Sequence, residues 1–320
     1  MDKDYIFAAE LFEAYIPTFT NKFSVVSSKK TLLNKILKLK INDDQKNFSI
    51  YIKTPLSKEK HATLFTEFSN IEKFNNFLNS SEKKFKCVEV IKYIKGPPEA
   101  IILKESQGES FFQIIKDSSH RLSFGDFSRS LNAAKISGEC IKFIESHTCG
   151  KESIHWVKDE ICGQVEEVAK KILILNKFPF MRESVKECLE IIKNSNFAEN
   201  ESYLSHGDFH PENLFIDVDS VTLIDFGISR PQFIGYDAIY FEHYLNNFDR
   251  IRYKPKNLKM IYEAFWAGYE RKLSPALLKA NKAQIFLNDL VYLSTKNGIL
   301  PFQKIMYFFD VLKAKAWLVR

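Results

Sequence analysis

The spacing of apolar residues divides the chain into a strand-rich first third and a mostly helical remainder. Apolar and polar residues alternate over 36–41 and again over 48–53, which is the period of a strand with one buried face. The segment between them, 42–47, consists of turn-forming residues, so 36–53 predicts a β-hairpin. Three further strands are predicted at 23–27, 88–94 and 100–103.

Helical periodicity is clear over 58–79, where one face carries Leu64, Phe68, Ile71, Phe74 and Leu78. The other predicted helices are 2–17, 128–146, 154–176, 182–193 and a series from about 237 to the end. A short hairpin interrupts them, because 214–216 and 221–224 are apolar runs on either side of a polar turn. The pattern predicts an α+β protein with a small sheet-plus-helix domain at 1–105 and a larger, mostly helical domain at 106–320.

Composition places the chain among globular proteins, with 45% hydrophobic and 27% charged residues over 320 positions. The longest stretch without Lys, Arg, Asp or Glu has eight residues, far fewer than the roughly 20 apolar residues of a membrane-spanning helix. Four acidic residues among the first thirteen argue against a signal peptide. We therefore expect a cytoplasmic protein.

The net charge of +6 is unevenly distributed. Residues 29–60 hold nine Lys and three acids, whereas 199–249 hold ten acids and one Arg. The basic segment lacks the interleaved aromatics and the motifs of nucleic-acid binders, so no nucleic-acid partner is predicted. Two interpretations remain: a solvated lysine-rich surface, or a surface on which some lysines meet nucleotide phosphates.

The most informative stretch is SHGDFHPENLF at 205–215, followed by Asp-Phe-Gly beginning twelve residues after Asn213. The predicted hairpin between them should place Asn213 and Asp225 side by side. Amide and carboxylate oxygens suit Mg²⁺, which binds one or two protein ligands together with phosphate oxygens. Asp208, five residues before Asn213, is placed to accept a proton from a substrate hydroxyl. Protein kinases use the same spacing.

These motifs resemble the aminoglycoside phosphotransferase and choline kinase-like family of small-molecule kinases, whose signature is similar to HGDFHPENLF followed by LIDFG. Gly207 stands where protein kinases usually have Arg, which favours the small-molecule branch. The resemblance covers roughly 24–270 and implies a bilobal, protein-kinase-like fold. It also implies Asp208 as catalytic base and Asn213 and Asp225 as magnesium ligands.

The family implies a lysine on a strand that contacts phosphates and a glutamate on the next helix that holds it. Lys53 ends the strand at 48–53, and Glu67 falls inside the apolar face of the following helix. A charge on an apolar face needs a buried partner, so Glu67 is preferred over Glu72 at the edge of that face. A solvated Lys53 at a strand end is the alternative interpretation.

Two further nucleotide contacts follow from the resemblance. The phosphate-covering segment corresponds to 27–31, which has no glycine, so Ser27 and Ser28 are expected to donate hydroxyl hydrogen bonds in its place. Lys104, Glu105 and Ser106 occupy the place of the hinge that would bind adenine.

The sequence therefore predicts a Mg²⁺-dependent transfer of the γ-phosphoryl group of ATP to a hydroxyl of a small molecule. The acceptor classes are sugars, amino sugars, aminoglycosides and amino alcohols. A catalytically inactive, nucleotide-binding or regulatory module is the alternative, favoured by the glycine-free loop. A protein kinase is disfavoured, since no Ala-Pro-Glu follows 225–227. Neither the acceptor nor the oligomeric state is indicated by the sequence.

Overall fold

The computed structural model describes residues 3–20, 22–31, 33–42, 47–57, 61–81, 84–175, 182–247 and 252–295. It has the predicted mixed α+β composition. The chain divides into two compact units. Unit 1 contains Met1–Ser137, His210–Ser229 and Ile251–Ile261, and unit 2 contains Gly138–Phe209, Arg230–Arg250 and Tyr262–Arg320. The predicted domain boundary between residues 105 and 106 stays a prediction.

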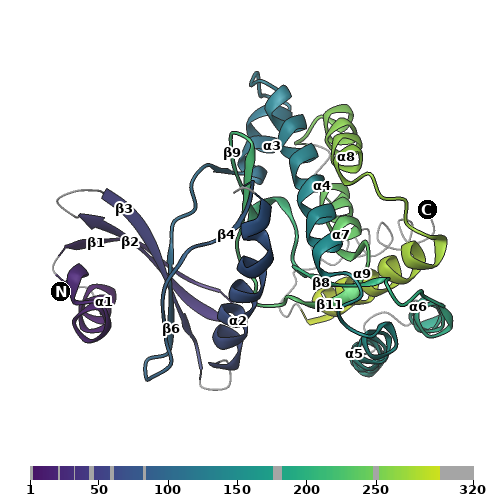
Figure 1. The fold of residues 1–320 in the computed structure, drawn as a ribbon, viewed down its shortest axis with the longest axis horizontal. Coiled ribbons are helices and arrows are strands. Elements are labelled where there is room, and N and C mark those ends of the chain that lie inside the picture. The colour runs from purple at the N-terminus through teal and green to yellow at the C-terminus, as the bar shows by residue number, and fades with distance from the viewer. Residues whose placement is uncertain are drawn as a thin grey trace. The chain divides into compact units, whose positions relative to one another are not determined.

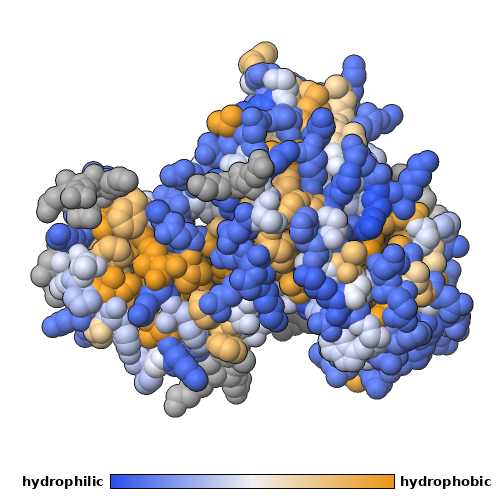
Figure 2. Space-filling model, in the orientation of Figure 1, coloured by the Kyte–Doolittle hydropathy of each residue, from blue (hydrophilic) through white to orange (hydrophobic). Residues whose placement is uncertain are grey.

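The first sheet of unit 1 is antiparallel, with strand order β1-β2-β3-β6-β5 (Figure 1). Its strands are β1 (Phe23–Lys30), β2 (Asn34–Asn42), β3 (Asn47–Pro55), β6 (Ala100–Lys104) and β5 (Val90–Ile94). Helix α1 (Lys3–Tyr15) packs on this sheet through Ala8, Leu11 and Phe12, which join Leu39 and Ile50 in one buried cluster. Figure 2 shows apolar atoms at the surface over these strands, next to α1, where partly buried side chains border that cluster.

The second sheet of unit 1 has the strand order β4-β10-β9-β7. Its strands are β4 (Phe85–Cys87), β10 (Ser220–Leu223), β9 (Leu214–Asp217) and β7 (Glu109–Ser110). Helix α2 (His61–Leu78) contacts β3 and β4, and helix α3 (Phe111–Ser119) contacts β9. The hairpin of β9 and β10 thus brings residues from the second half of the sequence into the unit that contains the N-terminal sheet.

Unit 2 is mostly helical around a two-stranded antiparallel sheet of β8 and β11. Its strands are β8 (Ser202–Ser205) and β11 (Arg230–Phe233). Its helices include part of α4 (Ser128–Thr148), α5 (Ile154–Leu175), α6 (Arg182–Asn194), α7 (Tyr236–Asn246), part of α8 (Pro255–Tyr269), and α9 (Pro275–Thr295). Helices α5, α6 and α9 contact one another. Across the described ranges, we found no helix with the length and apolar character that crossing a bilayer requires.

Both predicted hairpins and the predicted helices within the described residues are present. The bounds of β1 differ most from the prediction: it continues through Lys30, whereas a strand ending at Ser27 was predicted. The extension follows from pairing, because β1 stays in register with β2 from Ser27 to Lys30. The short strands β4, β7, β8 and β11 were not predicted, since two to four residues are too few to show an alternating pattern.

Candidate active site

Lys53 and Glu67 form a buried ion pair in unit 1, with 2.7 Å between Lys53 Nζ and Glu67 Oε1. Lys53 lies on β3, paired in register with both neighbouring strands, so the sheet fixes its backbone. Glu67 projects from α2 and its side chain is 2% exposed. Glu72 on the same helix is exposed. The predicted contact of Lys53 with Glu67 rather than Glu72 is therefore confirmed.

Asp225 is the second partner of Lys53, with 3.1 Å between Lys53 Nζ and Asp225 Oδ1. The backbone of Asp225 has a φ of +66°, in the left-handed region that a residue with a side chain seldom adopts. Burial acts to lower the pKa of Lys53, but the charges of Glu67 and Asp225 outweigh it and raise that pKa. Lys53 is therefore a permanent cation between two carboxylates.

Helix α2 also holds the chain that follows Asp225. The amide of Asn70 donates to the carbonyl oxygens of Phe226, at 2.9 Å, and Ser229, at 3.1 Å. The ring of Phe74 lies 4.9 Å from that of Phe226. Sequence reasoning missed Asn70, although a polar residue close to the apolar face of a predicted helix was a usable signal, because buried amides need partners.

Asn213 immediately precedes β9 at the start of the β9–β10 hairpin, and Asp225 lies two residues beyond the end of β10. The backbone N–H of Ile224 donates to the carbonyl of Asn213 at 3.1 Å, which closes the hairpin between them. Asn213 is 7% exposed, and its Nδ2 lies 3.2 Å from Nε2 of His210. That contact is made by the nitrogen of the Asn213 side-chain amide. The predicted positions of Asn213 and Asp225 at the two ends of one hairpin are thus present.

The chemistry of this donor set fits a hard divalent cation. Among the residues that the structure describes, no group of three or more His, Cys, Asp and Glu side chains could hold a metal. One carboxylate, half exposed at Asp225, and one amide at Asn213 form a small oxygen set. Mg²⁺ characteristically combines such a set with water and substrate phosphates.

The segment predicted to cover the phosphates lies mostly in a strand. Ser27 and Ser28 are exposed residues of β1, paired with β2, and the connection between the two strands begins at Thr31. The hydroxyl of Thr31 donates to the carbonyl of Asn34 at 3.0 Å, which fixes the turn without a glycine. A hydrogen bond from Ser28 contributes to lowering the pKa of Asp4 in α1, so this hydroxyl already has a partner.

The predicted hinge begins at the end of β6, where Lys104 pairs with Glu89 at 2.8 Å. The carboxylate of Glu105 accepts hydrogen bonds from Lys38 at 2.6 Å and from Tyr51 at 3.2 Å. The backbone N–H groups of Lys104 and Glu105 donate to carbonyl oxygens of unit 1. This part of the hinge is therefore fixed to the sheet, and Ser106 is the first residue beyond it.

The loop that carries Asp208 belongs to unit 2, and a buried aspartate at the start of α7 holds it. Asp237 is fully buried and accepts hydrogen bonds from the backbone N–H groups of His206, at 2.8 Å, and Gly207, at 2.9 Å. Nδ1 of His206 accepts from the N–H of Asp208 at 3.3 Å. The His206 ring therefore helps to order the backbone of this loop.

Tyr240, one turn further along α7, contacts Asp208 directly. Its hydroxyl donates to Oδ1 of Asp208 at 3.1 Å. Burial raises the pKa of Tyr240, so the hydroxyl stays protonated and remains a donor. The sequence predicted a helix from about residue 237 but neither of its contacts with the loop, because they join residues about thirty positions apart.

Residues 181–276 match the model of the phosphotransferase enzyme family. This segment contains Asp208, Asn213 and Asp225, the three residues of the signature. No curated protein sequence shows significant similarity to the chain.

Solved structures with the same fold extend over nearly the whole chain. An amicoumacin kinase is 12% identical, with a TM-score of 0.60 over 98% of this chain and 96% of its own. A choline kinase from Cryptosporidium parvum Iowa II is 14% identical, with a TM-score of 0.57 over 99% of this chain and 96% of its own. An aminoglycoside-3'-phosphotransferase of type VIII is 12% identical, with a TM-score of 0.56 over 88% of this chain and 98% of its own.

The resemblance drawn from the motifs is therefore confirmed. The chain has the fold of aminoglycoside phosphotransferases and choline kinases. The match of residues 181–276 to the phosphotransferase enzyme family agrees with the predicted enzyme class, a small-molecule kinase.

Proposed function

We propose that this protein transfers the γ-phosphoryl group of ATP to a hydroxyl of a small molecule, with Mg²⁺ as the metal. The observation that carries the proposal is the placement of Lys53 between Glu67 and Asp225, at 2.7 Å and 3.1 Å. A buried cation held by one carboxylate, beside a second carboxylate half exposed to solvent, suits a site for nucleotide phosphates and their metal. The amicoumacin kinase of the same fold was solved with AMP-PNP and Ca²⁺, which supports nucleotide and divalent metal use.

In the proposed nucleotide half, Lys53 contacts the phosphates and Glu67 keeps its amino group in place. Mg²⁺ held by Asn213 and Asp225 would neutralise phosphate charge during transfer. The backbone beyond Glu105 would bond adenine. Ser27 and Ser28 remain weaker candidates for phosphate contacts, because both lie in a paired strand.

In the proposed acceptor half, Asp208 orients the acceptor hydroxyl and takes its proton. The acceptor oxygen forms a bond to the γ-phosphorus as the bond from that phosphorus to the departing ADP breaks. The proton passes to the carboxylate of Asp208, and the products are a phosphate ester and ADP. Tyr240 donates to one carboxylate oxygen, which fixes the orientation of the base.

The acceptor belongs to the sugars, amino sugars, aminoglycosides or amino alcohols under this proposal. The net charge of −9 over residues 199–249, from ten acids and one Arg, would attract a cationic member of these classes; the alternative is that this charge only offsets that of the basic N-terminal segment. If a cation is captured by this charge, kcat/KM for the best acceptor should fall as ionic strength rises. A neutral or anionic best acceptor would contradict the cationic preference and leave the phosphotransfer proposal intact.

The direct test is a phosphorylation screen of these acceptor classes with Mg²⁺ and ATP, followed by three variants on the best acceptor. Asp208→Asn should keep nucleotide affinity and lose most of kcat, because only the acceptor contact changes. Asp225→Asn should abolish transfer at millimolar Mg²⁺. Asp217→Asn is the matched control, since Asp217 is an exposed acid of the same hairpin, and its turnover should equal that of the wild type.

Two results would contradict the proposal. Normal turnover by Asp225→Asn would contradict the proposed role of Asp225 as a Mg²⁺ ligand. Nucleotide binding without ATP hydrolysis or transfer to any acceptor, in the presence of Mg²⁺, would favour the alternative of an inactive nucleotide-binding module.

A further inference from the structure

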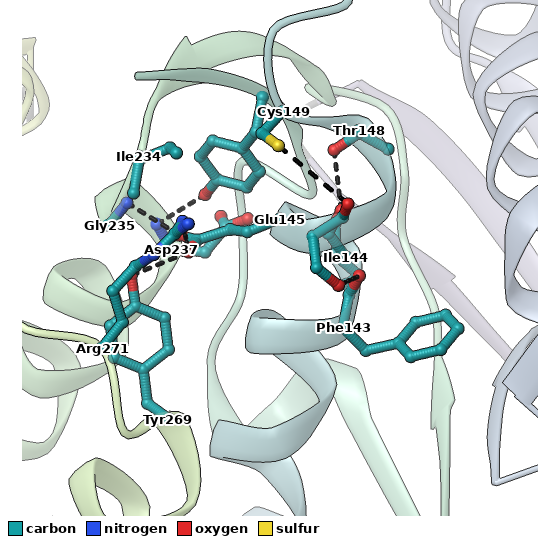
Figure 3. Close-up of polar contacts among 12 residues, drawn as sticks. Phe143, Ile144, Glu145, Thr148, Cys149, Ile234, Gly235, Asp237, Tyr269 and Arg271 are labelled. Atoms are coloured by element: carbon teal, nitrogen blue, oxygen red, sulfur yellow. Dashed lines mark hydrogen bonds and ion pairs between the residues drawn. The ribbon is translucent and has the colours of Figure 1, made fainter. Parts of the chain in front are cut away.

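Glu145, near the end of α4, is a buried carboxylate with three hydrogen-bonding partners in unit 2 (Figure 3). Its Oε1 accepts from the backbone N–H of Gly235 at 2.8 Å. The hydroxyl of Tyr269 lies 2.9 Å from both carboxylate oxygens, and Nη1 of Arg271 lies 2.8 Å from Oε2. The side chain of Glu145 is 2% exposed, so burial of this charge requires these partners.

The contact with Gly235 fixes the point at which α7 begins. Gly235 is the residue immediately before the helix and has a φ of +87°. A Cβ at this position would lie 2.5 Å from a methyl carbon of Leu273, so both the backbone conformation and the space require glycine. The N–H of Gly235 is directed at Glu145, which ties the start of α7 to α4.

The first turn of α7 in turn fixes the loop that carries Asp208. Asp237 stands two residues after Gly235 and binds the N–H groups of His206 and Gly207. Asp208 follows directly in the chain. A continuous series of short hydrogen bonds therefore runs from Glu145 through the start of α7 to the residue before Asp208.

We propose that Glu145 is a positioning residue that sets the start of α7 and, through Asp237, the placement of the Asp208 loop. The inference deepens the proposed function and rests on it for the role of Asp208. Catalysis by a base is sensitive to such placement, because displacements of about 1 Å from changes far from the chemistry can reduce turnover by about a hundredfold.

A carboxylate suits this position better than an amide of the same shape. Its two oxygens accept from an N–H, a hydroxyl and a guanidinium at the same time. Glutamine offers one oxygen, and its NH₂ group would face the Arg271 or Tyr269 donors with no lone pair to offer. Glu145→Gln should therefore loosen the contact with Gly235 while keeping the volume of the side chain.

The experiment compares Glu145→Gln with Glu167→Gln, an exposed glutamate on α5 that changes charge and shape in the same way. Two measurements are made on each. In steady-state kinetics with Mg²⁺ and ATP, Glu145→Gln should lower kcat about tenfold to a hundredfold with an unchanged KM for ATP. In amide hydrogen exchange, the N–H groups of His206 and Gly207 should exchange faster, while those of α5 keep their wild-type rates. Glu167→Gln should match the wild type in both.

The exchange measurement separates this inference from the proposed function, because it needs no catalytic activity. Absence of kinase activity in the wild-type chain would contradict the proposed function. The exchange rates of the His206 and Gly207 amides in Glu145→Gln, compared with the wild type, would still test the positioning role. Unchanged exchange at both amides in folded Glu145→Gln would overturn the inference, as would a wild-type kcat. If Glu145→Gln fails to fold, Tyr269→Phe and Arg271→Gln replace it, because each removes one donor to Glu145. A wild-type kcat and wild-type exchange rates in both of these variants would overturn the inference.

Discussion

The hydroxyl of Tyr240 donates a hydrogen bond to Oδ1 of Asp208 at 3.1 Å. Asp208 is thereby held at one oxygen by a donor that stays protonated, since burial raises the pKa of Tyr240. Under the proposed mechanism, the carboxylate held in this way orients the substrate hydroxyl. The contact joins the candidate base to α7, the same helix whose first turn holds the backbone of the loop.

Tyr240→Phe removes that hydroxyl and keeps the ring. We expect kcat to fall about three- to tenfold, because one hydrogen bond to a charged group contributes roughly 1.5–3 kcal/mol and part of it is recovered from water. The KM for ATP should not change, since the hydrogen bond that is removed goes to the candidate base. Steady-state kinetics with the best acceptor checks this. A raised KM for ATP with an unchanged kcat would show that Tyr240 serves the nucleotide.

Lys53→Met leaves two carboxylates, Glu67 and Asp225, without their shared cation. Removing one member of a buried pair typically costs about 3–5 kcal/mol of unfolding free energy, because the remaining charge is uncompensated. Glu67→Gln should cost less, about 1–3 kcal/mol, because Lys53 keeps Asp225 as partner. Urea denaturation measures both, with Glu72→Gln as control on the exposed side of α2. Equal losses for Glu67→Gln and Glu72→Gln would contradict the ion-pair geometry.

Val218, in the two-residue loop between β9 and β10, has a φ of +50° and is 80% exposed. A β-branched residue is strained in this left-handed conformation, whereas asparagine tolerates it. Val218→Asn should therefore raise the unfolding free energy by about 1 kcal/mol. The control is Val26→Asn at an exposed position of β1 that has no positive φ, where no gain is expected. A loss of stability in Val218→Asn would show that the strain is absent.

The stability of the protein should depend on pH through Glu145. Burial raises its pKa from 4.5 to about 7, against the opposing effects of Gly235, Arg271 and Tyr269. Between these values the folded state holds a proton that the unfolded state has released, so stability falls as pH rises from about 4.5 to about 7. Relative to Glu145→Gln, the wild type should lose up to about 3 kcal/mol over this window. Denaturant titrations at several pH values measure the difference, and parallel pH profiles of the two proteins would refute it.

Most of the first sheet could be predicted from the sequence because its strands alternate buried and exposed residues, as at Leu37, Leu39 and Ile41. Lys53 and Glu67 could be predicted because a charge inside the apolar face of a helix requires a partner. The end of β1 could not, since Ser27 to Lys30 have no apolar alternation and are held by pairing with β2 alone.

The supporting residues of the site were harder to predict than its chemical groups. Asp208, Asn213 and Asp225 are marked by local spacing. Asp237 and Tyr240 contact the loop across about thirty residues, and each taken alone is an ordinary polar residue of a helix. Only the folded chain shows that Asp237 meets two backbone N–H groups.

The three charged residues of this cluster, Lys53, Glu67 and Asp225, are synthesised at different times. Lys53 and Asp225 are 172 residues apart in sequence, and unit 1 includes residues as late as Ile261. At about 5–20 residues per second, roughly 10–35 seconds pass between the synthesis of the lysine and that of the aspartate. During that interval the nascent chain contains Lys53 and Glu67 but lacks Asp225 and the complete β9–β10 hairpin. The ribosome therefore adds Asp225 to the chain long after Lys53 and Glu67. In a nascent chain stalled before residue 225, Lys53 has Glu67 as a partner but lacks Asp225.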